Sequence, residues 1–296
     1  MKVIVLGATG FIGSHLVKDL LKNNYEVYAV IRNSKKIEIL PKGTKIIIGD
    51  PLQKGEWQEV ASQMDAGINL IGETIFKRWT KKYKKKLIDS RVISTKNLIE
   101  ALRNKTILFN ASAIGYYGDR GEEELIEESP AGKGFICELC KIWEKTAFEA
   151  EKKSIRVLIG RIGIVLGKNG GMLKVILPIF KAGLGGPLGN GKQWFSWIHI
   201  DDVTRAIRFL IENKNLSGIF NFVSPHPVRN KEFTKILSKI LKRPAFIPVP
   251  VFALKLLYGE LGEVIVSSTK VLPVRLLNYG FIFKYSQLEN ALKSII

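Results

Sequence analysis

The sequence predicts an α/β protein built on a doubly wound parallel sheet. Short apolar segments alternate with helical ones through the first 160 residues, which is the pattern of consecutive βαβ units. Each strand candidate is a nearly continuous apolar run, as expected for strands that are covered on both faces. The first strand candidate, Val3–Leu6, ends directly in a glycine-rich turn. A chain of 296 residues has room for such a domain and a smaller second one.

The individual elements follow from hydrophobic periodicity, which separates short apolar strands from helices with three- and four-residue spacing. We expect strands at Val3–Leu6, Glu26–Ile31, Lys45–Ile48, Ile68–Ile71, Thr106–Asn110, Ile155–Ile159, Trp197–Ile200 and Ile219–Val223. We expect helices at Phe11–Leu21, Ser90–Leu102, Phe135–Glu151 and Asp201–Asn213, and further helical stretches toward the C-terminus. Asp201 or Asp202 is expected to cap the fourth helix. The glycine-rich stretch Gly163–Gly191 predicts a long irregular segment.

The composition excludes several classes of protein. With 46% hydrophobic and 25% charged residues, the chain is neither disordered nor collagen-like nor a coiled coil. No apolar run approaches the ~20 residues of a membrane helix, and the apolar start Met1–Gly7 is too short for a signal peptide. Two cysteines exclude a disulfide scaffold and indicate a reducing compartment. We therefore expect a cytoplasmic globular protein.

The charge is strongly positive, with 46 Lys and Arg against 27 Asp and Glu and a net charge of +19. Such an excess indicates anionic partners, or else a surface that is lysine-rich throughout. One cluster of cations lies around Trp79 and Tyr83, in a segment with helical periodicity, and fits either a binding patch or a solvated face. This cluster consists of Lys77, Arg78, Lys81, Lys82, Lys84, Lys85 and Lys86. We expect a small anionic substrate and neither specific nucleic acid nor a membrane as partner, and we leave a homodimer open.

The glycine-rich turn predicts a dinucleotide site. Gly7 permits the tight turn out of the first strand, Gly10 lets the backbone approach a pyrophosphate, and Gly13 lets the helix pack against the sheet. The helix N-terminus then offers free N–H groups to the phosphates. A tight turn without a ligand is the alternative. The placement of the motif between a strand and a helix favours a Rossmann-type nucleotide domain.

The end of the second strand predicts which cofactor binds. NAD enzymes place Asp or Glu there to hold the ribose 2′-hydroxyl, whereas this strand ends in Ile31-Arg32. A guanidinium can grip a 2′-phosphate with paired hydrogen bonds, so NADP(H) is favoured over an Arg that only stacks on adenine. Asp50 is either an adenine contact or a turn residue before Pro51. Asn69–Gly72 is expected beneath the adenosine ribose.

These features divide the chain into two predicted domains. Residues 1–165 form the NADP-binding domain, to which residues 192–223 return. Residues 166–191 and 224–296 form a smaller α+β domain on the substrate side.

A longer series of motifs resembles one family. The series includes Asn69-Leu70-Ile71-Gly72-Glu73, Arg78-Trp79-Thr80, Ser112–Gly118, Arg161–Gly167, Gly183–Gly186 and Trp197–Asp202. It is similar over essentially the whole chain to the epimerase family proteins, a group of atypical extended short-chain dehydrogenases/reductases that are often described as nucleoside-diphosphate-sugar epimerases. The resemblance implies an NADP(H)-binding Rossmann fold with its own C-terminal domain and an unassigned substrate.

The glycine motif, the strand ends and the resemblance together give one expected set of cofactor-binding residues. The set is Gly7, Thr9, Gly10, Phe11, Ile12, Gly13, Ile31, Arg32, Asp50, Asn69, Leu70, Ile71, Gly72, Arg91, Ala111, Ser112 and Val165. Arg91 is expected as a second cation near the phosphates, with a charge on the helix surface as the alternative. The resemblance also implies that Lys192 and Gln193 lie over the nucleotide part of a substrate.

The catalytic groups of ordinary relatives are missing. The superfamily uses Ser or Thr, Tyr as the acid/base, and Lys to lower the pKa of that Tyr. Alignment on the resemblance places Ala113, Ile136 and Cys140 at these three positions. We therefore expect no standard epimerase mechanism. The remaining candidates near the nicotinamide are Ser112, Tyr116, Tyr117 and Cys140, each with a structural role as the alternative.

Two further groups could have a chemical or a structural role. Cys137 and Cys140 form a C-x-x-C pair, but the histidines are remote in sequence and a structural zinc needs four ligands, so we expect a buried thiol pair and no metal. His199 with Asp201 and Asp202 is expected to shape the interface between the domains. The function is then either that of an NADP(H)-dependent oxidoreductase or epimerase acting on an unassigned, anionic or nucleotide-sugar-like substrate, or that of a non-catalytic NADP(H)-binding regulator.

Overall fold

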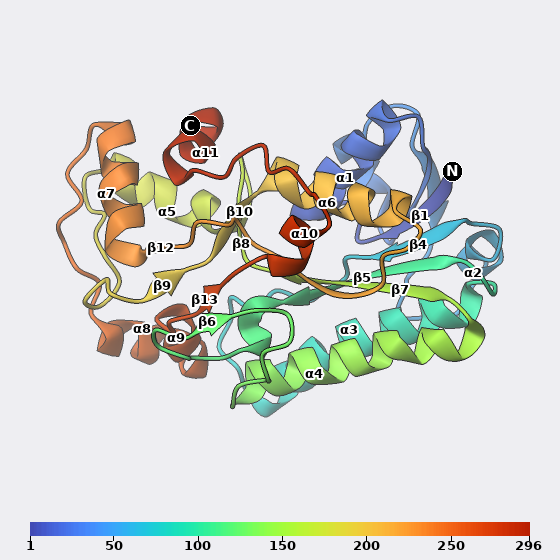
Figure 1. The fold of residues 1–296 in the computed structure, drawn as a ribbon, viewed down its shortest axis with the longest axis horizontal. Coiled ribbons are helices and arrows are strands. Elements are labelled where there is room, and N and C mark those ends of the chain that lie inside the picture. The colour runs from blue at the N-terminus through green and yellow to red at the C-terminus, as the bar shows by residue number, and fades with distance from the viewer.

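The computed structural model describes residues 1–296 and is centred on a seven-stranded parallel sheet (Figure 1). The strand order is β11-β7-β5-β4-β1-β2-β3, which reverses direction between β1 and β4. The strands are β1 (Lys2–Leu6), β2 (Glu26–Ile31), β3 (Lys45–Ile48), β4 (Ala66–Asn69), β5 (Ile107–Ala113), β7 (Arg156–Ile162) and β11 (Gly218–Phe222). This is a doubly wound Rossmann-type sheet, and the predicted fold class is confirmed.

Helices cover both faces of the sheet. On one face lie α1 (Phe11–Lys22) and α6 (Ile200–Glu212), and on the other lie α3 (Lys81–Ala101) and α4 (Phe135–Phe148) (Figure 1). Alternate residues of β1 point to the two faces, so that Val3 and Val5 belong to the core under α1 and α6, while Ile4 and Leu6 belong to the core under α3 and α4. A short helix, α2 (Trp57–Ala61), packs beside α3 with Trp57 fully buried.

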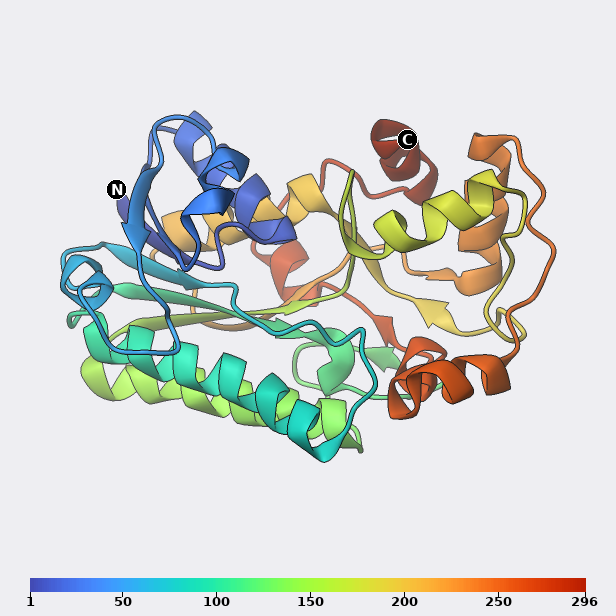
Figure 2. The same ribbon diagram turned by 180° about the vertical axis from the view of Figure 1, so that it is seen from behind.

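The remaining elements gather at the other end of the molecule, away from the N-terminus (Figures 1 and 2). Its helices are α5 (Gly171–Lys181), α7 (Asn230–Leu241), α8 (Val251–Tyr258), α9 (Glu260–Ile265) and α11 (Leu288–Ile295), while α10 (Val274–Asn278) lies against β11. Short strand pairs join the parts: β10 (Trp197–His199) with β8 (Ile164–Leu166), β12 (Val228–Arg229) with β9 (Trp194–Phe195), and β13 (Lys270–Val271) with β6 (Glu124–Leu125). A separate core around Trp197, Phe233 and Leu292 holds α5, α7 and α11 together. The division into two domains remains a prediction.

One expected segment is wrong. Residues 163–191 are not a long irregular stretch, because they contain β8 and α5. Several of the glycines mark close packing: a Cβ at Gly170 would lie 2.0 Å from Cδ2 of Phe11, and one at Gly186 would lie 1.8 Å from the carbonyl oxygen of Ile247. Glycine is required at both positions by the close approach of a neighbouring segment.

Two helix boundaries also differ from expectation. Helix α3 begins at Lys81 instead of Ser90, because the lysine-rich segment continues directly into the predicted helix. The Thr80 side chain caps this helix by accepting a hydrogen bond from the Tyr83 N–H. The N-cap of α6 is neither Asp201 nor Asp202 but His199, whose ring Nδ1 accepts from the Asp201 N–H at 3.1 Å. None of the helices combines the length and the apolar composition needed to cross a lipid bilayer.

Candidate functional site: a cleft at the carboxyl ends of β1, β2 and β4

The glycine-rich turn between β1 and α1 has the backbone that its sequence predicts. Gly7 has a φ of +83°, and a Cβ there would lie 3.0 Å from the backbone of Leu70. A Cβ at Gly13 would lie 2.2 Å from the carbonyl oxygen of Gly7, so this glycine allows the helix to sit close to the turn. No side chain caps α1 and its first turn holds no acidic residue. Its N–H groups and positive dipole end are therefore available to an anion.

This turn opens into a cleft of about 990 Å³. The cleft lies beside the point where the strand order reverses, which is where open α/β sheets bind ligands. Nine of the residues expected to bind a cofactor line it: Gly7, Thr9, Gly10, Ile31, Arg32, Asp50, Leu70, Ile71 and Gly72. Asp50 lines the cleft and also forms a turn, because its Oδ1 accepts from the Leu52 N–H at 3.0 Å.

Cations without carboxylate partners stand at the end of β2. Arg32 and Lys36 both line the cleft, both are exposed, and neither forms an ion pair with Asp or Glu. Asn33 between them accepts from the Lys35 N–H and begins a 3-10 turn, which brings Lys36 back to the cleft. Two unpaired positive charges at this edge favour an anionic group on the ligand.

Arg91 lies beside the cleft rather than on its surface. Its guanidinium donates to the carbonyl oxygens of Leu87 and Glu73 at 3.0 and 3.3 Å, stacks 5.0 Å above the Trp143 ring, and has no carboxylate partner. A Cβ at Gly72 would come within 2.9 Å of its Nη2, so the charge is pressed against the cleft backbone. Burial lowers the pKa of Arg91. A buried guanidinium with only neutral partners can still bind an anion.

The face of α3 forms a wall of the cleft that the expected residue set did not include. Residues of this helix that line the cleft are Lys82, Tyr83, Lys85, Lys86, Asp89, Ser90 and Ile93. Lys86 pairs with Glu73 at 3.1 Å and Lys85 pairs with Asp89, whereas Lys82 has no acidic partner. Their spacing of three to four residues on one helix was the available signal. The lysine cluster is therefore divided, with Lys84 facing away toward Glu260 of α9 at 2.6 Å.

The other expected cofactor residues support the cleft from behind or lie elsewhere. Besides Arg91 they are Phe11, Ile12, Gly13, Asn69, Ala111, Ser112 and Val165. Asn69 is fully buried, and its Oδ1 accepts from the Ile71 N–H at 3.0 Å while its Nδ2 donates to Thr95 and Asn110. Phe11 packs against Gly170, and Val165 lies in β8 beside Ile198. Asn69 thus fixes the backbone that lines the cleft.

A closed polar network lies at the carboxyl ends of β5, β7 and β11. Arg161 and Glu144 form a two-pronged ion pair at 2.9 and 2.8 Å, with both side chains almost fully buried. Ser112 donates to Glu144 at 2.6 Å, and Arg161 donates to the Tyr117 hydroxyl at 2.9 Å. That hydroxyl donates in turn to Asn221 at 2.7 Å. The sheet register places Ser112 and Asn221 on either side of Arg161, so the network follows from strand pairing.

The catalytic candidates have very different surroundings. Burial raises the pKa of Tyr117 to about 12, and its hydroxyl is fully engaged in the network. Burial also raises the pKa of Cys140 to about 12, so its thiol stays protonated at neutral pH. Ser112 is buried against Glu144. Tyr116 differs, because it is only half-buried, its ring lies 3.4 Å from the guanidinium carbon of Arg161, and no residue bonds to its hydroxyl.

Lys192 and Gln193 line a second cleft, of about 290 Å³, at the other end of the molecule. Gln193 donates to the Leu188 carbonyl oxygen at 3.0 Å, while the Lys192 side chain is exposed and has no acidic partner. Glu122 lines the same cleft and pairs with Arg229, and this pair together with Trp194 lowers the pKa of Glu122 to about 2. The smaller cleft is polar and carries one unpaired cation.

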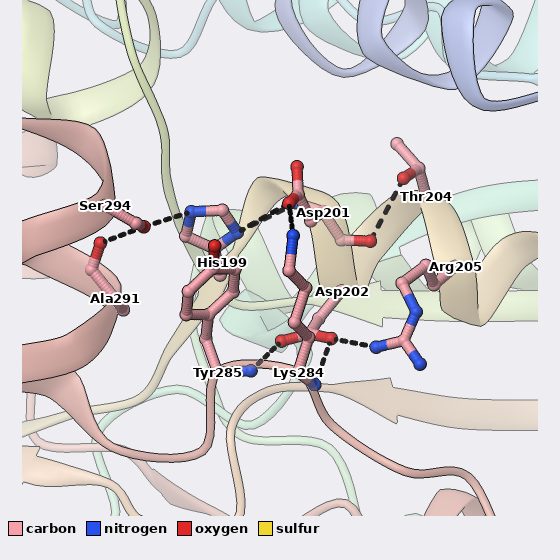
Figure 3. Close-up of polar contacts among 9 residues, drawn as sticks. All are labelled: His199, Asp201, Asp202, Thr204, Arg205, Lys284, Tyr285, Ala291 and Ser294. Carbon is pink, nitrogen blue, oxygen red and sulfur yellow. Dashed lines mark hydrogen bonds and ion pairs between the residues drawn. The ribbon is translucent and has the colours of Figure 1, made fainter.

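The N-terminus of α6 holds the C-terminal segment in place (Figure 3). Asp202 is fully buried and accepts from the backbone N–H groups of Lys284 and Tyr285 at 2.7 and 2.9 Å and from Arg205 at 2.8 Å. His199 stacks on the Tyr285 ring at 3.9 Å. Burial lowers the pKa of His199, which keeps the ring neutral so that it can accept a hydrogen bond. These contacts join two segments that are more than 80 residues apart.

Cys137 and Cys140 are both buried free thiols. No group of three or more His, Cys, Asp or Glu side chains is arranged to hold a metal ion.

Comparison with known proteins places this geometry in a family. Residues 3–223 match the NAD dependent epimerase/dehydratase family, and residues 249–295 match a domain of unknown function, DUF1731. The chain is 41% identical to the chloroplastic epimerase family protein SDR39U1 homolog of Arabidopsis thaliana, with 100% of this chain and 87% of that protein covered. It is 36% identical to the epimerase family protein YfhF of Bacillus subtilis, with 100% and 98% covered.

Solved structures support the same family assignment. The crystal structure of the human epimerase family protein SDR39U1 with NADPH has 32% sequence identity and a TM-score of 0.88, covering 100% of this chain and 99% of that one. A UDP-glucose 4-epimerase of Thermus thermophilus in complex with NAD shares the fold, with a TM-score of 0.78 at 20% identity over 99% and 97% of the two chains. The chain therefore belongs to the NAD dependent epimerase/dehydratase family, as an epimerase family protein of the SDR39U1 type within the NAD(P)-binding short-chain dehydrogenase/reductase superfamily.

Proposed function

We propose that the protein is an NADP(H)-dependent oxidoreductase that acts on a small anionic substrate. The observation that carries the choice of cofactor is the pair of unpaired cations, Arg32 and Lys36, at the end of β2. A carboxylate at this place would repel a 2′-phosphate, whereas a guanidinium and an ammonium attract it. The human relative crystallised with NADPH supports the same choice. Two free thiols fit a reducing, cytoplasmic setting.

The residues of the cleft match the parts of such a cofactor. The α1 N-terminus and the glycine turn would hold the pyrophosphate, with Arg91 as a further cation behind Gly72. Leu70 and Ile71 would lie under the adenosine ribose. When bound, the cofactor would supply or accept a hydride at its nicotinamide ring. The chain itself would bind, orient and exclude water.

Tyr116 is the group we propose to exchange a proton with the substrate oxygen. Tyr117 and Cys140 are buried with their pKa values raised to about 12, and Ser112 is bonded to Glu144. Tyr116 alone among the four candidates keeps an unbonded hydroxyl on a half-buried ring. Arg161 beneath that ring is fixed by Glu144, so the stack positions the phenol.

A non-catalytic NADP(H)-binding regulator is the second candidate function. It is favoured by the side chains at the three positions that the superfamily uses for catalysis. Ala113 and Ile136 carry no group that can move a proton, and the Cys140 thiol stays protonated. The same observation argues against epimerisation of common UDP-sugars by the usual route.

Calorimetric titration with NADPH and NADH tests the cofactor. The wild-type protein should prefer NADPH, and Arg32→Ala should lower NADPH affinity by about ten- to a hundredfold while leaving NADH affinity unchanged. Lys35→Ala is the matched control, because Lys35 lies in the same turn but does not line the cleft. Equal wild-type affinities for the two cofactors would overturn the assignment.

Hydride transfer, followed by the absorbance of NADPH with a panel of small anionic carbonyl compounds, separates the two functions. Turnover that falls about 10²–10⁴-fold in Tyr116→Phe, with unchanged NADPH affinity, would support the oxidoreductase. Turnover that survives in Tyr116→Phe would remove Tyr116 from the mechanism. Tight NADPH binding without turnover of any compound in the panel would favour the regulator.

A further inference from the structure

Large apolar side chains are exposed on α8 and on the segments beside it. Phe252 and Leu256 of α8 are 72% and 74% exposed, and Phe246, just before the helix, is 76% exposed. Single exposed apolar residues are ordinary, but a group of them on one surface of a globular protein marks a contact site. We call this group the apolar end face; it consists of Ile179, Leu184, Phe246, Ile247, Phe252, Leu256 and Leu257.

Backbone contacts show that these residues belong to neighbouring segments. The Leu184 N–H donates to the carbonyl oxygen of Ile179 at 3.1 Å, and the Ile247 N–H donates to Gly185 at 3.2 Å. A parallel bridge between Leu188 and Val249 continues the same pairing up to the start of α8. The apolar end face therefore runs from the end of α5 across this pairing to α8, at the end of the molecule remote from the N-terminus (Figures 1 and 2).

The charges within the segments that build the apolar end face are all positive, and the nearest acidic side chains, Glu260 and Glu263, belong to the neighbouring helix α9. The sequence contains no Asp or Glu from Lys152 to Ile200, and none from Phe233 to Gly259, which are the stretches that build this face. Exposed cations interrupt the apolar residues or flank them: Lys181, Lys242, Arg243 and Lys255. Of these four, only Lys255 has an acidic partner, Glu263 of α9, at 2.9 Å. The face thus combines apolar side chains with three cations, Lys181, Lys242 and Arg243, that have no acidic partner.

We propose that the apolar end face docks the protein onto an anionic lipid surface. Apolar side chains can enter the interfacial region while Lys and Arg meet the head groups, a combination typical of helices that lie on membranes. A second copy fits less well, because pairing the face with itself would oppose cations to cations. With eight residues, or about 12 Å, α8 can only lie on such a surface. This proposal replaces the expectation from the sequence that no membrane is a partner.

Flotation of the full-length protein with lipid vesicles tests the proposal. Protein should float with vesicles of phosphatidylcholine and phosphatidylglycerol in equal parts, should float poorly with phosphatidylcholine alone, and should be released by high salt. The double variant Phe252→Ser/Leu256→Ser should lose binding about tenfold or more. Neutralising Lys242 and Arg243 to Gln should weaken it about fivefold per charge.

Ile282→Ser is the matched control, because Ile282 is 77% exposed but lies outside the apolar end face. It should bind vesicles as the wild type does, and all variants should keep the wild-type melting temperature because the substituted side chains are exposed. Absence of binding to anionic vesicles at low salt would overturn the proposal. So would an equal loss in Ile282→Ser. Concentration-dependent dimerisation that Phe252→Ser/Leu256→Ser abolishes, without vesicle binding, would instead assign the face to a second copy.

Discussion

The open cleft and the buried network contain the same kinds of side chain in opposite states of pairing. In the cleft, Arg32, Lys36 and Lys82 have no acidic partner, and Arg91 beside it has only neutral ones. In the network, Arg161 is held by both carboxylate oxygens of Glu144. Cations that a fold leaves unpaired beside a cleft are available to a ligand, whereas cations that it pairs and buries hold the structure together. Whether a cation has an acidic partner, more than its residue type, therefore distinguishes the candidate site from the buried network.

Breaking the buried pair should have the largest effect on stability. Arg161→Met leaves the Glu144 carboxylate buried without its partner, and the free energy of unfolding should fall by about 3–5 kcal/mol. Equilibrium unfolding in urea measures this free energy. Arg161→Met with Glu144→Leu should recover much of the loss, because no charge is then left buried. Arg32→Met, in the open cleft, should change stability by no more than about 0.5 kcal/mol. A similar loss in both single variants would contradict the comparison.

The rate at which Cys140 is alkylated tests how well this buried part of the protein is shielded from solvent. With its pKa raised to about 12 by burial, roughly one thiol in 10⁴ is ionised at pH 8, and only the thiolate reacts. Iodoacetamide should therefore label it about a thousandfold more slowly in the native protein than in urea, as followed by mass spectrometry. Rapid labelling of the native protein would show that the thiol is reachable and ionised, and would restore Cys140 as a catalytic candidate.

Arg91 stands at the border between the two regions, and its substitution sharpens the comparison. Arg91→Leu should weaken NADPH and NADH binding by the same factor, about tenfold or more, because Arg91 lies behind Gly72 and away from the end of β2. Parallel titrations with both cofactors measure the ratio. Lys96→Ala, on an exposed position of the same helix, should change neither affinity. A selective loss of NADPH binding would move Arg91 to the 2′-phosphate.

The smallest expected effect concerns His199. Its pKa is lowered in the folded protein, so between that value and the ordinary value of about 6.5 the unfolded chain binds more protons. This contribution to stability is present above pH 6.5 and is lost as the pH falls through the folded pKa. The neighbouring charges Asp201, Asp202, Lys284 and His15 set that value together with burial.

Melting temperatures from pH 8 to pH 5 test this effect. His199→Asn keeps an acceptor for the helix cap but does not titrate, so it should lose less stability than the wild type over this range. Parallel curves for the two proteins would mean that His199 does not contribute to the pH dependence.

The sheet and the phosphate turn could be predicted because their signals are local. Each strand is an apolar run, Gly7 is required by its positive φ at the end of β1, and Gly13 is required by its close approach to Gly7 within one βα turn. The buried network could not be predicted, because Ser112, Glu144 and Arg161 meet only through sheet register and helix packing. The cleft wall on α3 was partly visible as a lysine cluster, but which lysines face the cleft depends on where the helix lies against the sheet.

In the glycine-rich segment, the sequence predicts a feature that the structure does not have. The glycines at residues 163–191 predict an irregular chain, since glycine commonly marks turns. In the structure, Gly170 instead makes room for Phe11, a residue 159 positions earlier. A requirement set by a distant partner leaves no periodic signal in the local sequence.

The attachment of the C-terminal segment to Asp202 has a consequence for the order in which the protein is made. All seven strands of the main sheet lie before residue 223, so the sheet can assemble while the ribosome is still adding the remaining residues. Asp202, however, needs the backbone N–H groups of Lys284 and Tyr285, which are synthesised more than 80 residues later. Until then its carboxylate has Arg205 as its partner within α6 and is otherwise hydrated. The nascent chain therefore exposes the surface around Asp202 to water until Lys284 and Tyr285 have been added.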